Sequence, residues 1–259
     1  MDKQSKIILI SGPTASGKSS FAVKIAKKIN GEIINADSMQ VYKQLKILTA
    51  RPKKDEQKNI KHHMYGVLDL DKRFSTGQWL KTAIKKIKEI KKRKKTPILV
   101  GGTGLYFQSL INGLVEIPEI PFNLRNKIRL IQKIEGQKKF YRKLLKIDPK
   151  SKDKFDPNDT QRTIRAFEVK SFTKISMYEW LNKTKSAFKS DEFLKLYINF
   201  KREDLIKRIS LRSKKMIENG AIKEVKKFIN SKIKNDLSVN KVIGIDELTQ
   251  YLDKKINLD

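Results

Sequence analysis

Short apolar runs alternate with helical patterns over the first hundred positions of the chain. Three largely apolar runs, at residues 7–10, 32–36 and 97–100, have the length of strands buried on both faces of a sheet. Apolar residues recur at helical spacing after the first run and again over residues 80–90. Because strands alternate with helices, the pattern predicts an α/β fold with a parallel sheet and helices on both faces.

A different pattern occupies the middle of the chain. Residues 113–191 carry helical, basic segments without a convincing buried strand, and the stretch EIPEIPFN stands near their start. Residues 194–200 return to an alternation of period two, and a helical pattern then runs over 205–229. We therefore expect residues 1–112 to begin the core, an all-helical insertion to follow, and residues 192–259 to return to the core with C-terminal helices.

The composition narrows the class of protein. With 259 residues and 38% hydrophobic content, the chain is long enough for one core and a smaller appended domain. It contains no Cys, and its two histidines, His62 and His63, are adjacent, so neither disulfides nor a histidine metal site are predicted. No stretch reaches the roughly 18 apolar residues of a membrane span, and no export signal opens the chain. We expect a cytoplasmic protein without membrane contact.

The charge of the chain points to a polyanionic partner. The sequence has 59 Lys and Arg against 28 Asp and Glu, a formal net charge of +31. Such an excess favours nucleic acid as the partner before a membrane surface. The alternative is a bias of genomic composition, because most of these basic residues are Lys in a chain also rich in Ile and Asn.

The segment GPTASGKSS follows the first apolar run and matches the phosphate-binding pattern G-x-x-x-x-G-K-[ST]. The backbone N–H groups of such a loop and the positive end of the following helix can hold a diphosphate. We expect Lys18 to reach the outer phosphate and the Ser19 hydroxyl to be placed for Mg²⁺. The motif does not identify the phosphate chain as that of ATP. The predicted diphosphate-binding residues are Gly12, Pro13, Thr14, Ala15, Ser16, Gly17, Lys18 and Ser19.

Two polar segments follow the next two predicted strands, where open parallel sheets place their active-site groups. In NADSMQVYKQL, Asp37 and Gln40 offer donors and acceptors to a ligand, although Asp37 and Ser38 are also typical helix caps. In GGTGLYFQSLINGL, the glycines allow close backbone approach beside the Thr103 hydroxyl. The alternative there is an ordinary turn from strand to helix.

The insertion contains one candidate surface for RNA. The segment DTQRTIRAFEV places Gln161, Arg162 and Arg165 within about one helical turn. Such a face can contact RNA phosphates and base edges, whereas the alternative is a solvated helix face.

Taken together, the motifs resemble the tRNA dimethylallyltransferase family. The resemblance covers the chain from Ile7 to about Leu252. The combination of the phosphate loop, Asp-Ser-x-Gln and Gly-Gly-Thr-Gly-Leu-Tyr is not shared by ordinary P-loop kinases. The segments that carry the resemblance are, in order, GPTASGKSS, ADSMQVYKQL, TARP, HHMYGVLDLD, FSTGQW, PILVGGTGLYFQSLINGL, DTQRTIRAFEV and MIENGAIKEV.

The resemblance implies a reaction and roles for individual residues. A family member transfers the dimethylallyl group of dimethylallyl diphosphate to N6 of the adenosine 3′ of the tRNA anticodon and releases diphosphate. The implied catalytic residues are Asp37, which accepts the N6 proton, Thr103 near the reacting centre, and Lys18, which with Ser19-bound Mg²⁺ neutralises the diphosphate. The target base must leave its stack to react.

The resemblance also implies a monomer that binds the tRNA anticodon stem-loop, with Gln40 recognising the target base. The implied tRNA-binding residues are Asp37, Ser38, Met39, Gln40, Thr103, Arg125, Gln161, Arg162, Thr163, Ile164 and Arg165.

The chain departs from the family pattern at two positions. Ile245 stands where Tyr is expected near the C-terminus, which weakens the case for RNA contacts there, and Arg51 in TARP stands where Lys is common. Two rival functions stay open at this point. One is a P-loop kinase of a small metabolite or nucleoside, and the other is a non-catalytic tRNA-binding protein.

Overall fold

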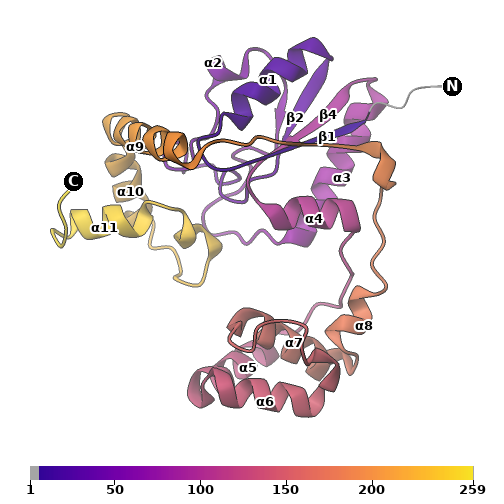
Figure 1. Ribbon diagram of the computed structural model, residues 1–259. Coiled ribbons are helices and arrows are strands. Elements are labelled where there is room, and N and C mark those ends of the chain that lie inside the picture. Colours follow the sequence, from indigo (N-terminus) through magenta and orange to yellow (C-terminus); the bar gives the residue numbers. More distant parts are fainter. Residues whose placement is uncertain (1–5, 259) are drawn as a thin grey trace. The chain divides into compact units, whose positions relative to one another are not determined.

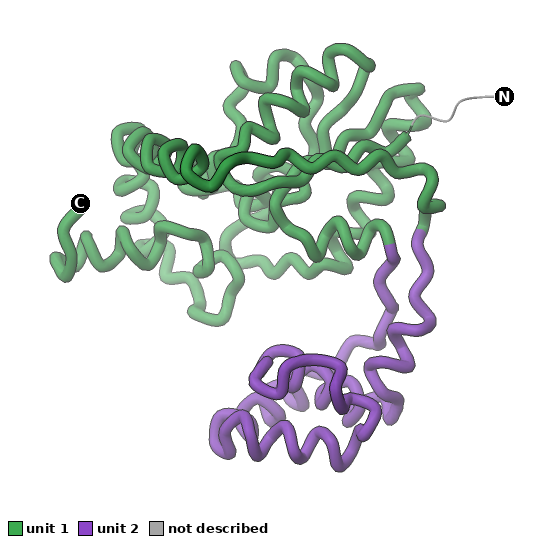
Figure 2. Tube along the Cα trace, in the orientation of Figure 1, with its two compact units in different colours: residues 1–111, 187–259 green, residues 112–186 purple. Residues whose placement is uncertain are grey.

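The computed structural model describes residues 6–258, which form two compact units (Figure 2). The first unit combines the residues up to 111 with those from 187 onward, and the second comprises residues 112–186. The inserted unit therefore begins one residue before, and ends five residues before, the range 113–191 expected from the sequence. Within residues 6–258, no helix has both the length and the apolar content to cross a bilayer.

The first unit is built on a parallel sheet of five strands in the order β3-β2-β4-β1-β5. Figure 1 labels the adjacent strands β2, β4 and β1 of this sheet. Every pair of neighbouring strands is parallel, which confirms the predicted sheet. Strand β3 was not predicted, because two residues are too few to show an alternation of apolar and polar positions. The strands are β1 (Ile7–Ser11), β2 (Gly31–Asn35), β3 (His62–His63), β4 (Thr96–Val100) and β5 (Phe193–Tyr197).

Helices cover both faces of the sheet, as the sequence predicted. Helix α1 (Lys18–Lys28) packs with its buried Ala22 and Ala26 on one face, against a cluster that includes Ile8 and Ile10. The neighbouring strand residues point to the opposite face because side chains alternate along a strand. There they meet α3 (Thr76–Lys92) and α4 (Gly104–Asn112).

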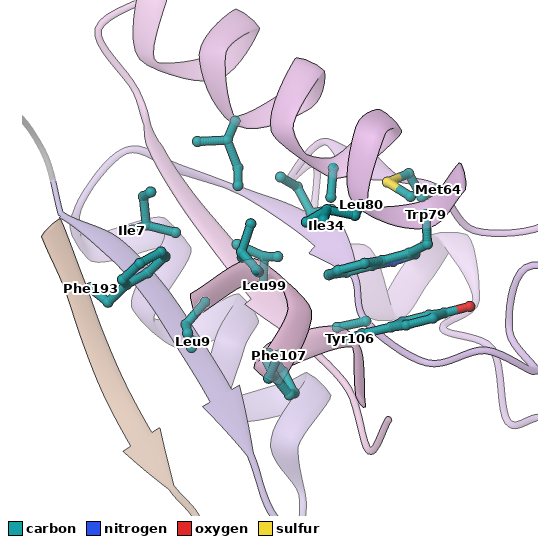
Figure 3. Packing of buried hydrophobic residues seen from close by; sticks show 14 of the residues in the cluster. Ile7, Leu9, Ile34, Met64, Trp79, Leu80, Leu99, Tyr106, Phe107 and Phe193 are labelled. Atoms are coloured by element: carbon teal, nitrogen blue, oxygen red, sulfur yellow. The ribbon is translucent and has the colours of Figure 1, made fainter. Parts of the chain in front are cut away.

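Figure 3 shows this second face, where Leu9, Ile34 and Leu99 of the sheet pack with Trp79 of α3 and Tyr106 of α4. The Trp79 and Tyr106 rings stack with centroids 4.2 Å apart. The Trp79 indole N–H donates to the Asn35 carbonyl at 3.0 Å, so α3 is tied to the end of β2 by a polar contact as well.

Two expectations for the C-terminal part were wrong in detail. The helix expected over 205–229 is two helices, α9 (Arg202–Glu218) and α10 (Ala221–Asn230), because Gly220 adopts a left-handed φ of 98° between them. The alternation over 194–200 continues as a strand only to Tyr197. Leu194 is 45% exposed, since β5 is an edge strand, and Phe193 is the strand's buried residue.

A second core joins the segment after β2 to the C-terminal helices. Tyr42 and Leu45 from that segment pack with Phe228 of α10 and Ile245 of α11 (Ile245–Leu252). The segment between β2 and β3 otherwise consists of turns and the short helix α2 (Lys54–Gln57). Residues 6–258 also contain three single-turn 3₁₀ helices: η1 (Pro149–Ser151), η2 (Ser190–Glu192) and η3 (Ser238–Lys241).

The second unit is all-helical. Phe140 and Leu144 of α6 are fully buried, as are Ala166 and Val169 of α7. The buried Asp148 carboxylate accepts hydrogen bonds from the hydroxyls of two serines, at 2.9 Å each, which fixes the turn after α6. The helices are α5 (Phe122–Glu135), α6 (Gln137–Ile147), α7 (Thr160–Thr173) and α8 (Met177–Leu181).

Candidate active site

The loop between β1 and α1 takes a shape that its glycines make possible. Gly12 has a φ of 151°, and a Cβ there would lie 2.7 Å from the Ile198 carbonyl oxygen. Gly17 has a left-handed φ of 87° and directly precedes the first residue of α1. The first N–H groups of α1 have no partner within the helix and point toward the loop, which is the arrangement that binds phosphate.

Two side chains of the loop supply further donors. The Lys18 ammonium donates to the carbonyls of Gly12 at 2.9 Å and Pro13 at 2.6 Å, so it is held over the loop. The Ser16 hydroxyl is buried, and none of the described residues forms a hydrogen bond with it. A buried hydroxyl without a partner is costly, and an anionic oxygen in the loop would satisfy it.

Asp37 lies two residues after the end of β2, and its own turn fixes its carboxylate. Its Oδ1 accepts hydrogen bonds from the N–H groups of Met39 at 2.8 Å and Gln40 at 3.4 Å. No helix begins between residues 36 and 53 of the described chain, so Asp37 caps a turn and not the helix considered from the sequence. Because the turn uses only Oδ1, the second carboxylate oxygen is left to accept a proton.

Asn35 orients the backbone of Asp37 from the strand below. Its Oδ1 accepts from the Asp37 N–H and its Nδ2 donates to the Asp37 carbonyl, both at 2.9 Å. The Asn35 Nδ2 also donates to the Met64 carbonyl at 3.2 Å, and the Asn35 side chain is fully buried. The sequence analysis missed this residue, although a polar amide at the end of an apolar strand is a signal that could have found it.

Thr103 joins the tip of β4 to the tip of β2. Its Oγ1 accepts from the Ser38 N–H at 3.0 Å and lies 3.3 Å from the Ser38 hydroxyl. The two strand ends can approach because residue 101 is Gly: a Cβ there would lie 2.0 Å from the Ala36 carbonyl oxygen. The turn is therefore more than an ordinary strand-to-helix connection, since it places the Thr103 hydroxyl beside the Asp37 segment.

The long helix α9 contributes two arginines that the sequence analysis missed. Burial lowers the pKa of the Lys18 ammonium and of the Arg212 guanidinium, whereas the Asp37 carboxylate raises the pKa of both. Asp37 thus lies within electrostatic reach of two cations. Arg208 lies beside the loop, with its Nη2 3.7 Å from where a Cβ on Gly17 would be, and its guanidinium stacks 4.6 Å from the centroid of the Phe200 ring.

Gln40 has a structural task in addition to its expected role. Its Nε2 donates to the carbonyls of Thr49 at 2.8 Å and Ala50 at 3.2 Å. The Glu224 carboxylate of α10 accepts three backbone N–H groups of the same segment, at 2.7 to 3.1 Å, from Lys46, Ile47 and Leu48. Any contact of Gln40 with the target base therefore depends on its side-chain oxygen, and that contact remains a prediction.

The two departures from the family pattern have structural explanations. The Arg51 guanidinium donates to the carbonyls of Tyr42 at 3.0 Å and Lys43 at 3.1 Å, a double contact made by its planar fork. Ile245 is 4% exposed and packs in the core that joins α10 and α11 to the segment after β2. Both residues therefore support the site from outside it.

In the second unit, α7 presents some of the expected RNA contacts and buries another. Gln161 and Arg162 are exposed, and Arg165 is half-buried, as is Ile164. Thr163 is fully buried: its hydroxyl donates to the Asp159 carbonyl at 2.8 Å and accepts from Gln137 at 2.9 Å. The structure thus gives Thr163 an internal role and does not place its hydroxyl where RNA can reach it. The sequence could not show which side of the helix this residue occupies.

The donor atoms near the loop limit how a metal can be bound. Residues 6–258 contain no cluster of three or more His, Asp or Glu side chains arranged to hold a metal ion. The oxygen donors near the loop include the half-buried Ser19 hydroxyl, and the Asp37 carboxylate lies within electrostatic reach of Lys18. This set fits Mg²⁺, which keeps several waters and is commonly bound through substrate phosphates with few protein ligands.

A cavity of about 490 Å³ opens beside the start of α1, and neither Asp37 nor Thr103 lines it. Lysines give it a basic rim, which suits an anionic ligand approaching the loop. Its lining residues are Ser19, Ser20, Val23, Lys24, Lys27, Ala50, Pro52, Glu56 and Lys58.

A family model and a curated relative of this chain point to the same family of transferases. The family model described as IPP transferase matches residues 40–259. The tRNA dimethylallyltransferase of Pelagibacter ubique (strain HTCC1062) is 74% identical over 259 residues, which are 100% of this chain and 83% of that protein.

Solved structures of enzymes that act on tRNA are also similar to this chain. The full-length tRNA isopentenylpyrophosphate transferase of Bacillus halodurans is similar with a TM-score of 0.66 and 33% identity, over 98% of this chain and 79% of that one. A eukaryotic dimethylallyltransferase acting on tRNA is similar with a TM-score of 0.84 and 33% identity, over 97% of this chain and 64% of that one.

Proposed function

Because this chain belongs to the IPP transferase family, we propose that it transfers a dimethylallyl group from dimethylallyl diphosphate to N6 of the adenosine 3′ of the anticodon in tRNA. One observation carries the proposal. A carboxylate, Asp37, stands within electrostatic reach of Lys18 and Arg212 at the phosphate-binding loop. The arrangement offers a proton acceptor and an anion site side by side, as the two ends of this transfer require.

At the nucleophile end, the reaction forms a bond from adenine N6 to C1 of the dimethylallyl group. The exocyclic amine is a weak nucleophile because its lone pair is delocalised into the ring. As the bond forms, N6 loses a proton, and the free oxygen of Asp37 accepts it. Asn35 holds the Asp37 backbone and the N–H of Met39 holds its carboxylate, so no reorganisation is needed at the moment of transfer.

At the leaving end, the bond from C1 to the diphosphate oxygen breaks and its electron pair departs with the diphosphate. The loop N–H groups, Lys18 and Arg212 neutralise the charge that grows there, and the Ser16 hydroxyl donates to one oxygen. The Ser19 hydroxyl would hold Mg²⁺, which would supply additional positive charge to the leaving diphosphate. Thr103 contacts the substrate near the same centre. Its side-chain oxygen also accepts a hydrogen bond from the Ser38 N–H, which fixes the turn that begins at Asp37.

The tRNA substrate requires recognition beyond the reacting atoms. The target adenine must be flipped out of the anticodon loop, because a stacked base cannot offer N6 to a half-buried carboxylate. Ser38, Met39 and Gln40 lie next to Asp37 for contacts with that base, and Gln161 and Arg162 are exposed on the second unit for contacts with RNA. With a net charge of +31, phosphate contacts supply affinity that depends on salt. One chain holds all these residues, so a monomer in the cytoplasm is sufficient for the proposed activity.

A transfer assay tests the proposal directly. Purified protein, Mg²⁺, radiolabelled dimethylallyl diphosphate and a tRNA with adenosine 3′ of the anticodon are incubated beside a parallel ATP-hydrolysis control. Label in the tRNA, and none in a transcript changed at that adenosine, is the expected result. Binding of tRNA without transfer would leave a non-catalytic binding protein, and ATP turnover without tRNA would indicate a kinase.

A further inference from the structure

A buried carboxylate in the second unit stands among three arginines. The Glu168 side chain, on α7, is only 2% exposed. Its oxygens lie 3.6 Å from Arg125 Nε, 3.5 Å from Arg129 Nε and 3.6 Å from Arg165 Nη1. Two of these arginines come from α5 and one from α7, so a single carboxylate gathers guanidinium groups from two helices.

The charges of this group do not balance. One carboxylate faces three guanidinium groups, which leaves an excess of two positive charges. The arginine side chains are 37%, 45% and 43% exposed, so each reaches solvent while its counter-charge does not. Burial lowers the pKa of the Arg165 guanidinium, the Glu168 carboxylate raises it, and the positive charge of Arg125 lowers it.

The hydrogen bonds of the group are also incomplete. The Glu168 Oε1 and Arg125 Nε atoms are buried, and neither forms a hydrogen bond with any described residue. The ion-pair distances of 3.5 and 3.6 Å exceed the usual 2.7–2.9 Å of a charge-assisted hydrogen bond. Each guanidinium group has five N–H donors, and because the three arginine side chains are partly exposed, a further anion can reach some of them. A purely structural ion pair would be expected to satisfy its donors within the protein.

We propose that Glu168 is a positioning residue that holds Arg125, Arg129 and Arg165 together as one binding site for RNA backbone phosphate. The inference rests on the proposed function and deepens it, since tRNA is the RNA in question. Arg129 and Glu168 are new members of the RNA-binding surface, whereas Arg125 and Arg165 were expected from the sequence. The excess of two charges matches two phosphodiester groups, and a guanidinium fork fits phosphate oxygens in pairs.

Removing the charge of Glu168 separates this role from a general electrostatic effect. We compare the wild-type chain of 259 residues with Glu168→Gln and with Glu179→Gln, a control that removes an exposed carboxylate of the same unit. By simple Coulomb attraction, losing either negative charge would leave tRNA binding unchanged or tighter. If Glu168 positions the arginines, Glu168→Gln instead weakens tRNA binding and raises the Kd about tenfold. It raises KM for tRNA in parallel and leaves kcat and the KM for dimethylallyl diphosphate unchanged.

Arg129→Gln gives a second test that does not disturb a buried group, because its side chain is 45% exposed. We expect weaker tRNA binding and a salt dependence of log Kd whose slope is smaller by about 0.7–0.9. In the double variant with Glu168→Gln, the loss from Arg129→Gln becomes smaller than in the wild type, because the arginine is no longer held. Thermal unfolding of each variant establishes that it is folded at the assay temperature.

The outcomes are decisive for the inference and separable from the proposed function. Folded Glu168→Gln and Arg129→Gln proteins that bind tRNA like the wild type, with an unchanged salt slope, would show a purely structural ion-pair group and overturn the inference. A wild type that binds tRNA but transfers no dimethylallyl group would refute the proposed function, while the binding comparison would still decide the role of Glu168.

Discussion

The backbone N–H of Ser38 donates to the Thr103 side-chain oxygen across 3.0 Å, which joins the ends of β2 and β4. The bond fixes the turn that begins at Asp37, the residue before Ser38. Thr103 therefore acts on the proposed proton acceptor through the backbone as well as lying near the reacting centre.

Replacing Thr103 tests this link. Thr103→Val keeps the shape of the side chain but leaves the Ser38 N–H without its acceptor, at a cost of about 1–3 kcal/mol if the group stays buried. We expect kcat for dimethylallyl transfer to fall by one to two orders of magnitude, and Thr103→Ser, which keeps the oxygen, to retain most of the activity. Equal rates for the Val and Ser variants would show that the hydroxyl has no part in the reaction.

Replacing the proposed proton acceptor separates chemistry from binding. Asp37→Asn keeps an oxygen that can accept from the Met39 N–H, so the turn should persist. Loss of a general base typically lowers the rate by about 10²–10⁴-fold, and we expect a fall of this size in single-turnover transfer. The Kd for tRNA, measured on the same preparation, should stay nearly that of the wild type. Transfer at the wild-type rate would disprove the assigned role.

Arg212 provides a test of the anion site from α9. Without its guanidinium the diphosphate loses one positive charge, so Arg212→Gln should raise KM for dimethylallyl diphosphate about tenfold or more. Inhibition by inorganic diphosphate should weaken in the same proportion. Arg202→Gln, which alters an exposed arginine in the first turn of the same helix, serves as the matched control and should leave both constants unchanged. Parallel changes in the two variants would point to general electrostatic attraction.

The elements nearest the loop could be predicted because their signals are local. The runs that became β1, β2 and β4 are largely apolar, and the phosphate-loop motif lies between the first of them and a helix. Asp37 and Thr103 follow strand ends, which is sufficient to place them at the same edge of a parallel sheet. The all-helical nature of the second unit could also be predicted from the sequence, since its segments show no strand-like alternation of apolar and polar residues.

The remaining parts depend on contacts between residues that are far apart in the sequence. Arg212 and Glu224 reach the site from C-terminal helices, and no pattern within those helices shows which side chain faces the loop. The helix break at Gly220 was missed because the apolar period continues on both sides of it. Glu168 looked like one more charged residue of a helix, and only its burial among arginines from α5 gives it a role.

A second buried carboxylate lies in the first unit, near the start of β2. Glu32 is 2% exposed and contacts His63 at 2.6 Å, Arg93 at 2.7 Å and Lys95 at 3.2 Å. Burial alone would raise the pKa of Glu32, but the hydrogen bonds from Arg93, His63 and Lys95 outweigh it and lower the pKa to about 2. Burial lowers the pKa of His63, and the contact with Glu32 only partly offsets this.

Both groups make stability depend on pH in the same direction. The unfolded chain binds more protons than the folded one, at Glu32 below its ordinary pKa of 4.5 and at His63 below 6.5. The His63 contribution is therefore complete above pH 6.5 and declines as the pH falls below it. The Glu32 contribution is complete above pH 4.5 and is lost as the pH falls toward 2.

Denaturant unfolding across this pH range tests the prediction. At pH 7 we expect Glu32→Gln to lower the free energy of unfolding by about 3 kcal/mol, because three cationic or polar partners lose their charged acceptor. The difference from the wild type should shrink as the pH falls from 4.5 toward 2, since protonation removes the same charge from the wild type. Glu218→Gln, at an exposed position, should differ from the wild type by no more than about 0.5 kcal/mol at any pH. A Glu32→Gln deficit that stays constant from pH 7 to 2 would mean that the ionised carboxylate is not what stabilises this end of the sheet.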